Sequence, residues 1–314
     1  MRKISIAIII LVNFLPMRLK AQTDLDAIMM EKNQLCIGPM YTYSSFKNYW
    51  EGSVKRGNTN MGTVLTQTYS VMANYGISAK LNLLFNVPYV QTNASVGSLH
   101  GMKGMQDLSL FLKWMPLEQQ LGSGTISVYT IAGGSVPLSN YVADFMPLSI
   151  GLHSKTASAR VIVDYQVSRF FLTGSATYVA RDKIKIDRTA YYDNQLHLSN
   201  QVNIPDASNF NFRAGYRSSK LIAEAVLNKF TTLGGFDISR NNSPFPSNRI
   251  NATTLGINFK LELTPKNNLS IVAGGNTTVA GRNTGQSRTY YGSVFYVLDF
   301  SHQLKTINKS GKTR

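Results

Sequence analysis

Few residues in this sequence could perform chemistry by their type and spacing. The candidates for nucleophilic or metal chemistry are His100, His153, His197, His302 and Cys36. A serine hydrolase built on a β-strand would place His and Ser two positions apart, so that both project to the same side. His153 and Ser154 are adjacent instead, and isolated histidines with one cysteine lack the spacing of a metal site. The sequence therefore predicts no enzyme, no metal site and no other cofactor.

Charged residues form a second group, because several lie inside segments in which polar and apolar residues alternate. If such a segment crosses a membrane, an outward Lys or Arg near mid-bilayer costs about 2 to 4 kcal/mol, so these residues should face a lumen. They would either pair with one another and stabilise the wall or contact a solute, and both alternatives stay open. The predicted lumen-lining residues are Asp107, Lys113, Arg160, Asp164, Arg213, Glu224, Lys260 and Glu262.

The segment from Gln106 to Trp114 shows the alternation most clearly. One set of positions carries leucines and ends in Trp114, and the other carries Asp107, Ser109 and Lys113. This period of two predicts a β-strand with one apolar and one polar face. A soluble sandwich would contain one or two such strands, whereas a membrane barrel repeats them about a dozen times.

The pattern recurs along the chain, with connections that are alternately short and long. Strands are predicted at 35–46, 64–75, 81–89, 106–114, 125–133, 156–166, 170–181, 210–217, 221–230, 251–263, 269–278 and 289–300. Transmembrane barrels combine short periplasmic turns with long extracellular loops, and an even strand count returns both termini to the periplasm. The sequence therefore predicts an all-β fold, an antiparallel up-and-down transmembrane β-barrel of about 12 to 14 strands. The loops 134–155 and 182–208 are long enough to fold inward and narrow the passage.

The first residues have the form of a secretory signal. Arg2 and Lys3 precede a mostly apolar run at residues 4–16, which is too short for a membrane-spanning helix of roughly 20 residues. We expect cleavage between Ala21 and Gln22 and export to the outer membrane of a Gram-negative bacterium. The expected regions are a signal peptide (1–21), a periplasmic lead-in with room for a short helix (22–34), the barrel (35–300) and a basic periplasmic tail (301–314).

Composition limits the partners. The chain has 32 basic and 16 acidic residues, a net charge of +16, but only 15% of its residues are charged. Soluble domains average about 25%. An exported protein rarely meets nucleic acid, so the basic excess favours anionic lipid head groups or anionic solutes. We expect outer-membrane lipids and an unidentified small solute as partners and no nucleic acid, and the sequence does not determine the oligomeric state.

Three stretches resemble a known family. These are YGISAKLNLLFNVPYV (75–90), GMQDLSLFLKW (104–114) and MPLSIGLHSK (146–155). They are similar to motifs of the MetA-pathway phenol-degradation family of outer-membrane barrel transporters, and the resemblance covers roughly residues 63 to 300. It implies uptake of small, often hydrophobic or aromatic compounds and brings no catalytic residues. The sequence departs from the family in the basic residues that follow Phe300.

Together these patterns favour a passive outer-membrane channel or transporter for small molecules. Two alternatives from other classes stay open at this point. One is a barrel-borne hydrolase that modifies lipids, and the other is a structural or adhesion barrel whose loops carry the function.

Overall fold

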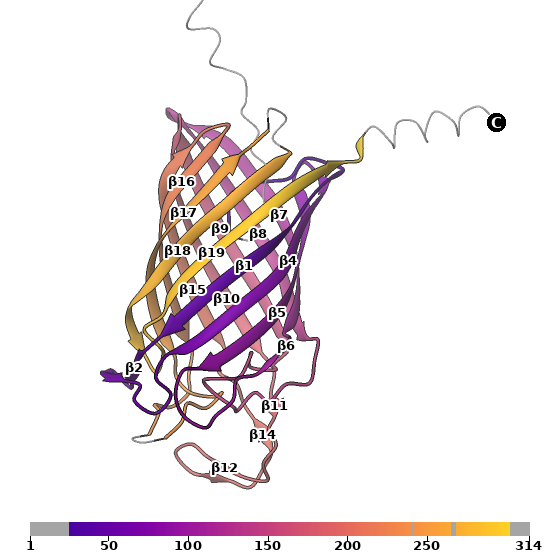
Figure 1. Ribbon diagram of the computed structural model, residues 1–314. Coiled ribbons are helices and arrows are strands. Elements are labelled where there is room, and N and C mark those ends of the chain that lie inside the picture. Colours follow the sequence, from indigo (N-terminus) through magenta and orange to yellow (C-terminus); the bar gives the residue numbers. More distant parts are fainter. Residues whose placement is uncertain (1–24, 240–241, 265–267, 302–314) are drawn as a thin grey trace, which may run out of the picture.

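The chain folds into one closed wall of antiparallel β-strands. The computed structural model describes residues 25–239, 242–264 and 268–301, and no helix among them is long and apolar enough to cross a membrane. Twelve long strands form the wall. They are β1 (Gln34–Phe46), β4 (Val64–Ser78), β5 (Leu81–Ala94), β7 (Asp107–Leu121), β8 (Gly124–Pro137), β9 (Thr156–Val167), β10 (Phe170–Arg181), β15 (Ala207–Arg217), β16 (Leu221–Thr232), β17 (Asn251–Glu262), β18 (Leu269–Arg282) and β19 (Arg288–Asp299). The ring closes because β1 pairs with both β4 and β19 (Figure 1).

The alternation of side chains decides which residues face outward. On β10, Phe170 and Leu172 are 68% and 60% exposed, whereas Phe171 and Thr173 are buried. A closed sheet has no free edge, so the whole outer surface of the wall is made by such outward positions. The exposed face is therefore apolar and the buried face is rich in polar residues, which is the reverse of a soluble domain.

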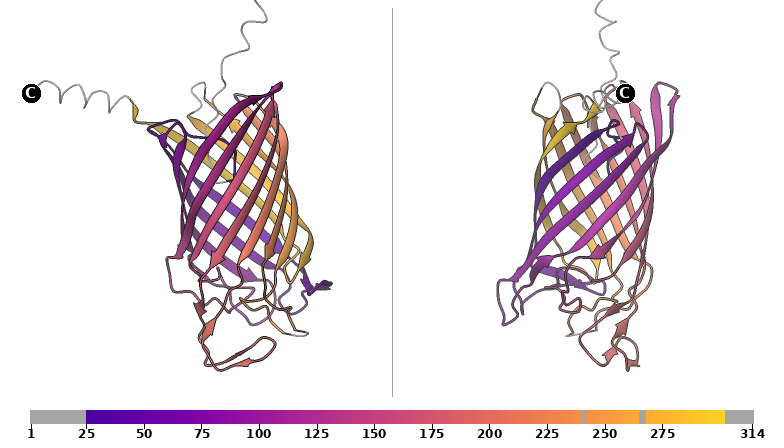
Figure 2. Two further views of the ribbon diagram at one scale, coloured as in Figure 1. Left: turned by 180° about the vertical axis from the view of Figure 1, so that it is seen from behind. Right: turned by 90° about the vertical axis from the view of Figure 1, so that its right-hand side faces the viewer.

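The two ends of the barrel differ in the length of their connections. At the turn end, short links such as 122–123 and 168–169 join consecutive strands. At the loop end, long segments such as 138–155, 182–206 and 233–250 connect the others (Figures 1 and 2). β1 begins and β19 ends at the turn end. The predicted all-β barrel of twelve strands with alternately short and long connections is thus confirmed.

Some strands are longer than the sequence predicted. The fourth predicted strand ends at Trp114, because Pro116 reads as a turn signal. The structure continues β7 to Leu121, and its pairing with β8 shifts register between Trp114 and Leu117. A β-bulge accommodates a proline that cannot donate to the ladder. Local turn signals therefore shorten the predicted strand without breaking the real one.

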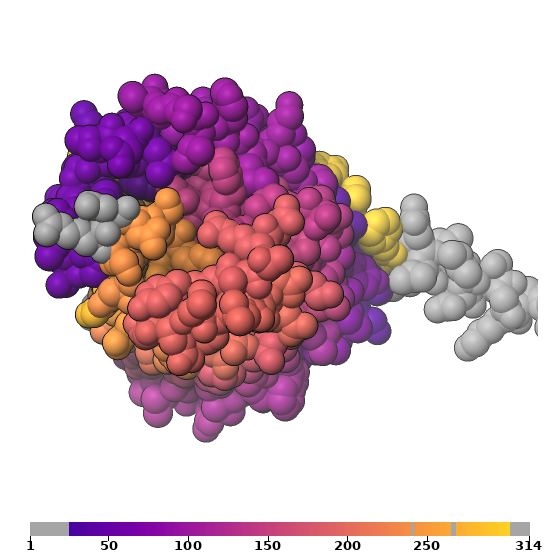
Figure 3. Space-filling model, turned by 90° about the horizontal axis from the view of Figure 1, so that it is seen from below, coloured from indigo at the N-terminus to yellow at the C-terminus, as the bar shows by residue number. Residues whose placement is uncertain are grey.

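The connections at the loop end carry short strands of their own. These are β2 (Asn48–Glu51), β3 (Val54–Gly57), β6 (Lys103–Met105), β11 (Ile184–Lys185), β12 (Tyr191–Tyr192), β13 (Leu196–His197) and β14 (Gln201–Val202). Residues from two different connections, Ala143, Ile184 and Val202 among them, bury one another in an apolar cluster. Seen from this end, the reddish residues of 182–206 cover much of the barrel (Figure 3). The loops therefore form a packed cap.

Candidate transport pathway

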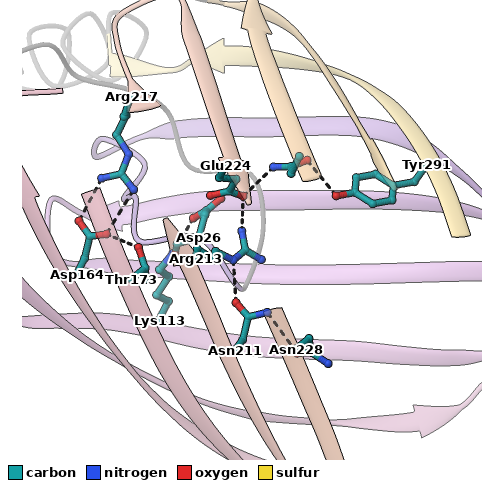
Figure 4. A network of polar contacts seen from close by, with 11 residues as sticks. Asp26, Lys113, Asp164, Thr173, Asn211, Arg213, Arg217, Glu224, Asn228 and Tyr291 are labelled. Carbon is teal, nitrogen blue, oxygen red and sulfur yellow. Dashed lines mark hydrogen bonds and ion pairs between the residues drawn. The ribbon is translucent and has the colours of Figure 1, made fainter. Parts of the chain in front are cut away.

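Polar side chains of neighbouring strands meet on the inner side of the wall. Asp164 on β9 accepts hydrogen bonds from Thr173 on β10 and from Arg217 on β15, whose Nη1 lies 3.1 Å from its Oδ2 (Figure 4). The Arg217 guanidinium also stacks on the ring of Phe171, with Cζ 4.0 Å from the ring centroid. Asp164 and Arg217 are both more than nine-tenths buried. A buried charge is tolerated only when it is paired and hydrogen-bonded, as these are.

A second group joins β15, β16, β17 and β19. Arg213 Nη1 lies 2.7 Å from Glu224 Oε1, and the same oxygen accepts a hydrogen bond from Asn258 Nδ2 at 2.9 Å. The hydroxyl of Tyr291 donates to Asn258 Oδ1 at 3.1 Å. Arg213 Nε donates to Asn211 on its own strand at 2.8 Å. These bonds connect four strands of the wall through their side chains, in addition to the backbone hydrogen bonds between neighbouring strands (Figure 4).

The remaining predicted residues occupy separate positions along the strands. Lys260 Nζ lies 2.7 Å from Glu262 Oε1, and both side chains are buried. Arg160 Nε donates to Thr177 Oγ1 at 2.7 Å. Asp107 accepts a hydrogen bond from the loop residue Tyr141 at 2.7 Å. The structure therefore brings together Arg213 with Glu224 and Lys260 with Glu262, whereas the other four predicted residues bond to partners outside the predicted set.

Lys113 reveals a feature that the sequence pattern did not predict. Its Nζ donates to the backbone oxygens of Asp26 at 2.5 Å and Ile28 at 2.9 Å, and lies 3.0 Å from the Asp26 carboxylate. The hydroxyl of Tyr129 on β8 donates to the backbone oxygen of Ala27 at 2.9 Å. We call residues 26–31 the luminal segment, because these contacts place its first residues against the inner wall. The sequence predicted a periplasmic lead-in at residues 22–34, and residues 26–28 of that stretch bond to side chains of the inner wall.

Apolar contacts hold the other end of the luminal segment. Met30 is 1% exposed and packs with Cys36, Phe295 and Val297 at the turn end of the wall. Gly76 on β4 leaves room for this approach, since a Cβ there would lie 2.0 Å from the backbone oxygen of Glu31. Side chains of the wall satisfy the carbonyl groups of Asp26, Ala27 and Ile28, and the backbone N–H of Gln34 donates to the carbonyl of Glu31. It thereby occupies part of the lumen near the turn end.

A small cavity remains beside the luminal segment. Its volume is about 40 Å³, and it lies between residues 26–28 and the opposite wall formed by β10 and β15–β18. Charged residues at its surface are Asp26, Arg213, Arg217, Glu224 and Lys260. Residues 26–28 of the luminal segment thus attach to the wall at Lys113 and Tyr129 and leave a charged space against β10 and β15–β18.

At the loop end, the connection between β8 and β9 folds against the inner wall. Thr92 on β5 donates from Oγ1 to the backbone oxygen of Leu148, and Leu148 is completely buried. Tyr141 packs edge-to-face on His153 with centroids 4.9 Å apart. Burial raises the pKa of the Tyr141 hydroxyl, and its hydrogen bond to Asp107 raises it further. Tyr141 therefore stays protonated at neutral pH and donates its hydrogen bond to Asp107 at the loop end of β7.

Two of the histidines, His153 and His197, are engaged in loop contacts, whereas His100 is exposed. His197 Nε2 lies 3.0 Å from Asp193, and its ring stacks on Tyr191. His153 contacts the ring of Tyr141. Within the described ranges no three His, Cys, Asp or Glu side chains gather as possible metal ligands. His302 and the predicted signal peptide and basic tail lie outside the described residues, apart from Ser301.

The sequence missed two residues that now belong to this interior. Arg217 lies four residues after Arg213 on β15 and faces the same side of the strand, so the alternation itself could have identified it. Asp26 carried no such signal, because the luminal segment has neither strand nor helix periodicity. Its position depends on Lys113, 87 residues away.

Comparisons with known proteins show the fold. No protein-family model matches the sequence, and no curated protein matches it either. The COG4313 outer membrane channel from Pseudomonas putida F1 is similar in structure, with a TM-score of 0.68 and 11% identity over 89% of this chain and 100% of that chain. The NalP autotransporter translocator domain from Neisseria meningitidis (TM-score 0.47, 11% identity, 87% of this chain and 90% of that chain) and the NanC porin (0.46, 7%, 82% and 98%) are also similar. At 11% identity, the first of these establishes a shared barrel architecture.

Proposed function

We propose that this chain is an outer-membrane channel through which small solutes pass by diffusion. The observation that carries the proposal is the opposite polarity of the two faces of one closed wall. On the outside, Leu110, Trp114 and Phe170 are 51%, 52% and 68% exposed. On the inside, ion pairs such as those of Lys113, Asp164 and Arg213 are buried.

A lipid environment accounts for the outer face. Large apolar side chains in contact with water over a whole barrel would cost roughly 25 cal/mol per Å² of exposed apolar surface, and a bilayer removes that cost. Trp114 lies near the turn end, where an aromatic belt would meet the head groups. In this orientation the turn end faces the periplasm and the loop end faces the exterior. Outer-membrane lipids are therefore the partners we propose for the wall.

The interior supports a narrow passage rather than an open pore. The cap at the loop end and the luminal segment near the turn end both reduce the lumen, and the charged residues of the inner wall would contact whatever passes. The eight residues predicted as lumen-lining belong to this proposal. The sequence motifs that resemble the phenol-degradation family favour a small organic solute, with hydrophobic or aromatic compounds included, and the Pseudomonas putida protein of similar fold is an outer membrane channel.

Reconstitution tests the proposal. Purified full-length chain in planar bilayers should give discrete single-channel currents, and liposomes containing it should swell in small solutes and not in large ones. The same preparation boiled before reconstitution is the control. A barrel that shows heat-modifiable migration on a denaturing gel yet passes neither ions nor solutes would refute the channel. Cleavage of the liposome phospholipid would support the hydrolase alternative in its place.

A further inference from the structure

The cavity beside the luminal segment has an unequal set of charges at its surface. Arg213, Arg217 and Lys260 contribute three cations, and Asp26 and Glu224 contribute two carboxylates. The partners of Arg217 and Lys260, which are Asp164 and Glu262, are not among the described residues that line it. Positive groups therefore reach this space while part of their compensating charge lies elsewhere in the wall.

Both carboxylates at the cavity already hold hydrogen-bond donors. Glu224 Oε1 accepts from Arg213 and from Asn258. Asp26 is bound by Lys113, which does not line the cavity. A cation entering here would have to compete with these donors for the same carboxylates. The cations are paired as well, Arg213 with Glu224, Arg217 with Asp164 and Lys260 with Glu262, so an unsatisfied donor would decide which group the cavity favours.

Arg217 supplies the second, independent observation. Its side chain is 9% exposed, its Nη1 donates to Asp164 and Gln166, its Nη2 donates to Asp164 at 3.5 Å, and its face is covered by Phe171. Its Nε is buried and has no hydrogen-bond partner among the described residues. A buried N–H without an acceptor costs free energy, and an incoming oxygen atom would remove that cost. Guanidinium groups bind carboxylates especially well, because two parallel N–H donors match the two oxygens.

We propose that this cavity is an internal binding site for the carboxylate group of a small organic acid, with Arg217 as the main donor and Arg213 and Lys260 beside it. A space of about 40 Å³ admits a group of a few atoms, so the remainder of the solute lies in the adjoining lumen. The role of the site rests on the proposed channel function, because in a channel this site would select anionic solutes. The binding itself can be measured without transport.

The binding test uses acetate and acetamide, which have similar size and differ in charge. Full-length chain in detergent should broaden the NMR line of [1-¹³C]acetate and leave [1-¹³C]acetamide sharp. Arg217→Gln should weaken acetate binding about tenfold or more. Arg169→Gln removes the same charge from an exposed residue at the turn end that does not line the cavity, and this variant should bind acetate like the unmodified chain.

Arg217→Gln leaves Asp164 buried without its arginine, so that variant could fail to fold. The double variant Asp164→Asn/Arg217→Gln removes both charges and serves as the second test, with heat-modifiable migration as the check on folding. Acetate broadening that survives in the folded double variant, or acetamide broadening of equal size, would overturn the proposal. If acetate broadening survives in the double variant and chloride suppresses it there as it does in the unmodified chain, the anions bind at a place other than Arg217.

Bilayer currents separate this inference from the channel proposal. In a potassium acetate gradient the reversal potential should show acetate preference in the unmodified chain and a shift toward potassium in the double variant. Absence of any current, together with acetate binding that requires Arg217, would refute the channel and leave the binding site standing. Current with potassium preference in the unmodified chain would refute the site's role in selection.

Discussion

The ammonium group of Lys113 lies 3.0 Å from the carboxylate of Asp26, and the Lys113 side chain is completely buried. All three of its proton positions are used, by that carboxylate and by the backbone oxygens of Asp26 and Ile28. A lysine on the inner wall of the barrel is thus neutralised by the N-terminal part of the chain. This contact joins the wall to the luminal segment.

Replacing Lys113 should therefore release the luminal segment. Lys113→Met removes the ammonium from the Asp26 carboxylate, and loss of one partner of a buried ion pair costs about 3 to 5 kcal/mol. We expect a higher single-channel conductance than that of the unmodified chain. Tyr129→Phe removes one hydrogen bond, worth about 1 kcal/mol, and should have a smaller effect in the same direction. Lys155→Met, at an exposed lysine of the loop end, is the control, and equal conductance in all three variants would contradict the prediction.

A reversible cross-link, which fixes the luminal segment to the wall, tests whether its release raises the conductance. Cys36 is the chain's one cysteine, so Cys36→Ser gives a cysteine-free background. Ala27 and Ile131 pack in one buried cluster. Cross-linking Ala27→Cys to Ile131→Cys with a short reducible reagent should hold the conductance low, and reduction should restore it. Unchanged current on tethering and reduction would mean that the luminal segment does not move during conduction.

Gly76 offers a steric test of the luminal segment. In Gly76→Ala the new Cβ would meet the backbone oxygen of Glu31 at 2.0 Å, a separation that real Cβ atoms do not adopt. We expect the luminal segment to shift, conductance to rise and heat-modifiable migration of the barrel to persist. Gly292→Ala on β19 is the matched control, because the atom nearest to the new Cβ, the backbone oxygen of Val272, would lie 4.0 Å away. Identical conductance of the two variants would show that residues 30 and 31 do not limit the passage.

The facing of β7 can be tested at two adjacent residues. Leu110 is 51% exposed on the outer face, so Leu110→Arg would place a cation in lipid at a cost of about 2 to 4 kcal/mol. We expect impaired assembly, seen as loss of heat-modifiable migration. Ser109 lies on the opposite register, and Ser109→Arg should assemble normally and change the ion preference of the current. Similar behaviour of both variants would contradict the assigned facing.

The loop end should show a simple pH dependence at Asp237. Its carboxylate accepts hydrogen bonds from Arg282 Nε and Asn283 Nδ2, both at 2.7 Å. The hydrogen bonds from Arg282 lower the pKa of Asp237 below its ordinary value. A carboxylate with a lowered pKa contributes its full stabilisation above its unfolded pKa of about 3.9, and loses it as the pH falls through the lowered value. The hydrogen bonds from Arg282 and Asn283 to the Asp237 carboxylate should therefore persist from neutral to mildly acidic pH.

Hydrogen exchange of residues 233–239 provides the measurement. The amide of Ile238 donates to Asn283 Oδ1 and should be protected at pH 7 and lose protection only below about pH 4. Asp237→Asn should lower that protection already at pH 7. Asp193→Asn, in the separate connection between β12 and β13, should leave it unchanged. Loss of protection near pH 6 would require a different titrating group.

The sequence alone was sufficient to predict the wall. Alternation with a period of two is a local property, and each strand carries enough of it to reveal its own two faces, as Gln106–Trp114 does. Strand ends were less accurate, because Pro116 reads locally as a turn and only the pairing of β7 with β8 accommodates it in a bulge. The inward register of Arg217 was equally available from its spacing to Arg213.

The tertiary structure decided which inward charges meet and what fills the lumen. Asp164 and Arg217 are 53 residues apart and pair only because β10 lies between β9 and β15. The register places Asp164 opposite Thr173 and Thr173 opposite Arg213, and the long Arg217 side chain reaches Asp164 from four residues further along β15. The luminal segment has no periodicity, and its place follows from a curved wall that surrounds it with Lys113, Tyr129 and the cluster around Met30. Closure of the barrel creates this interior. A local pattern can predict a strand with two faces, but the contents of the enclosed space depend on all twelve strands together.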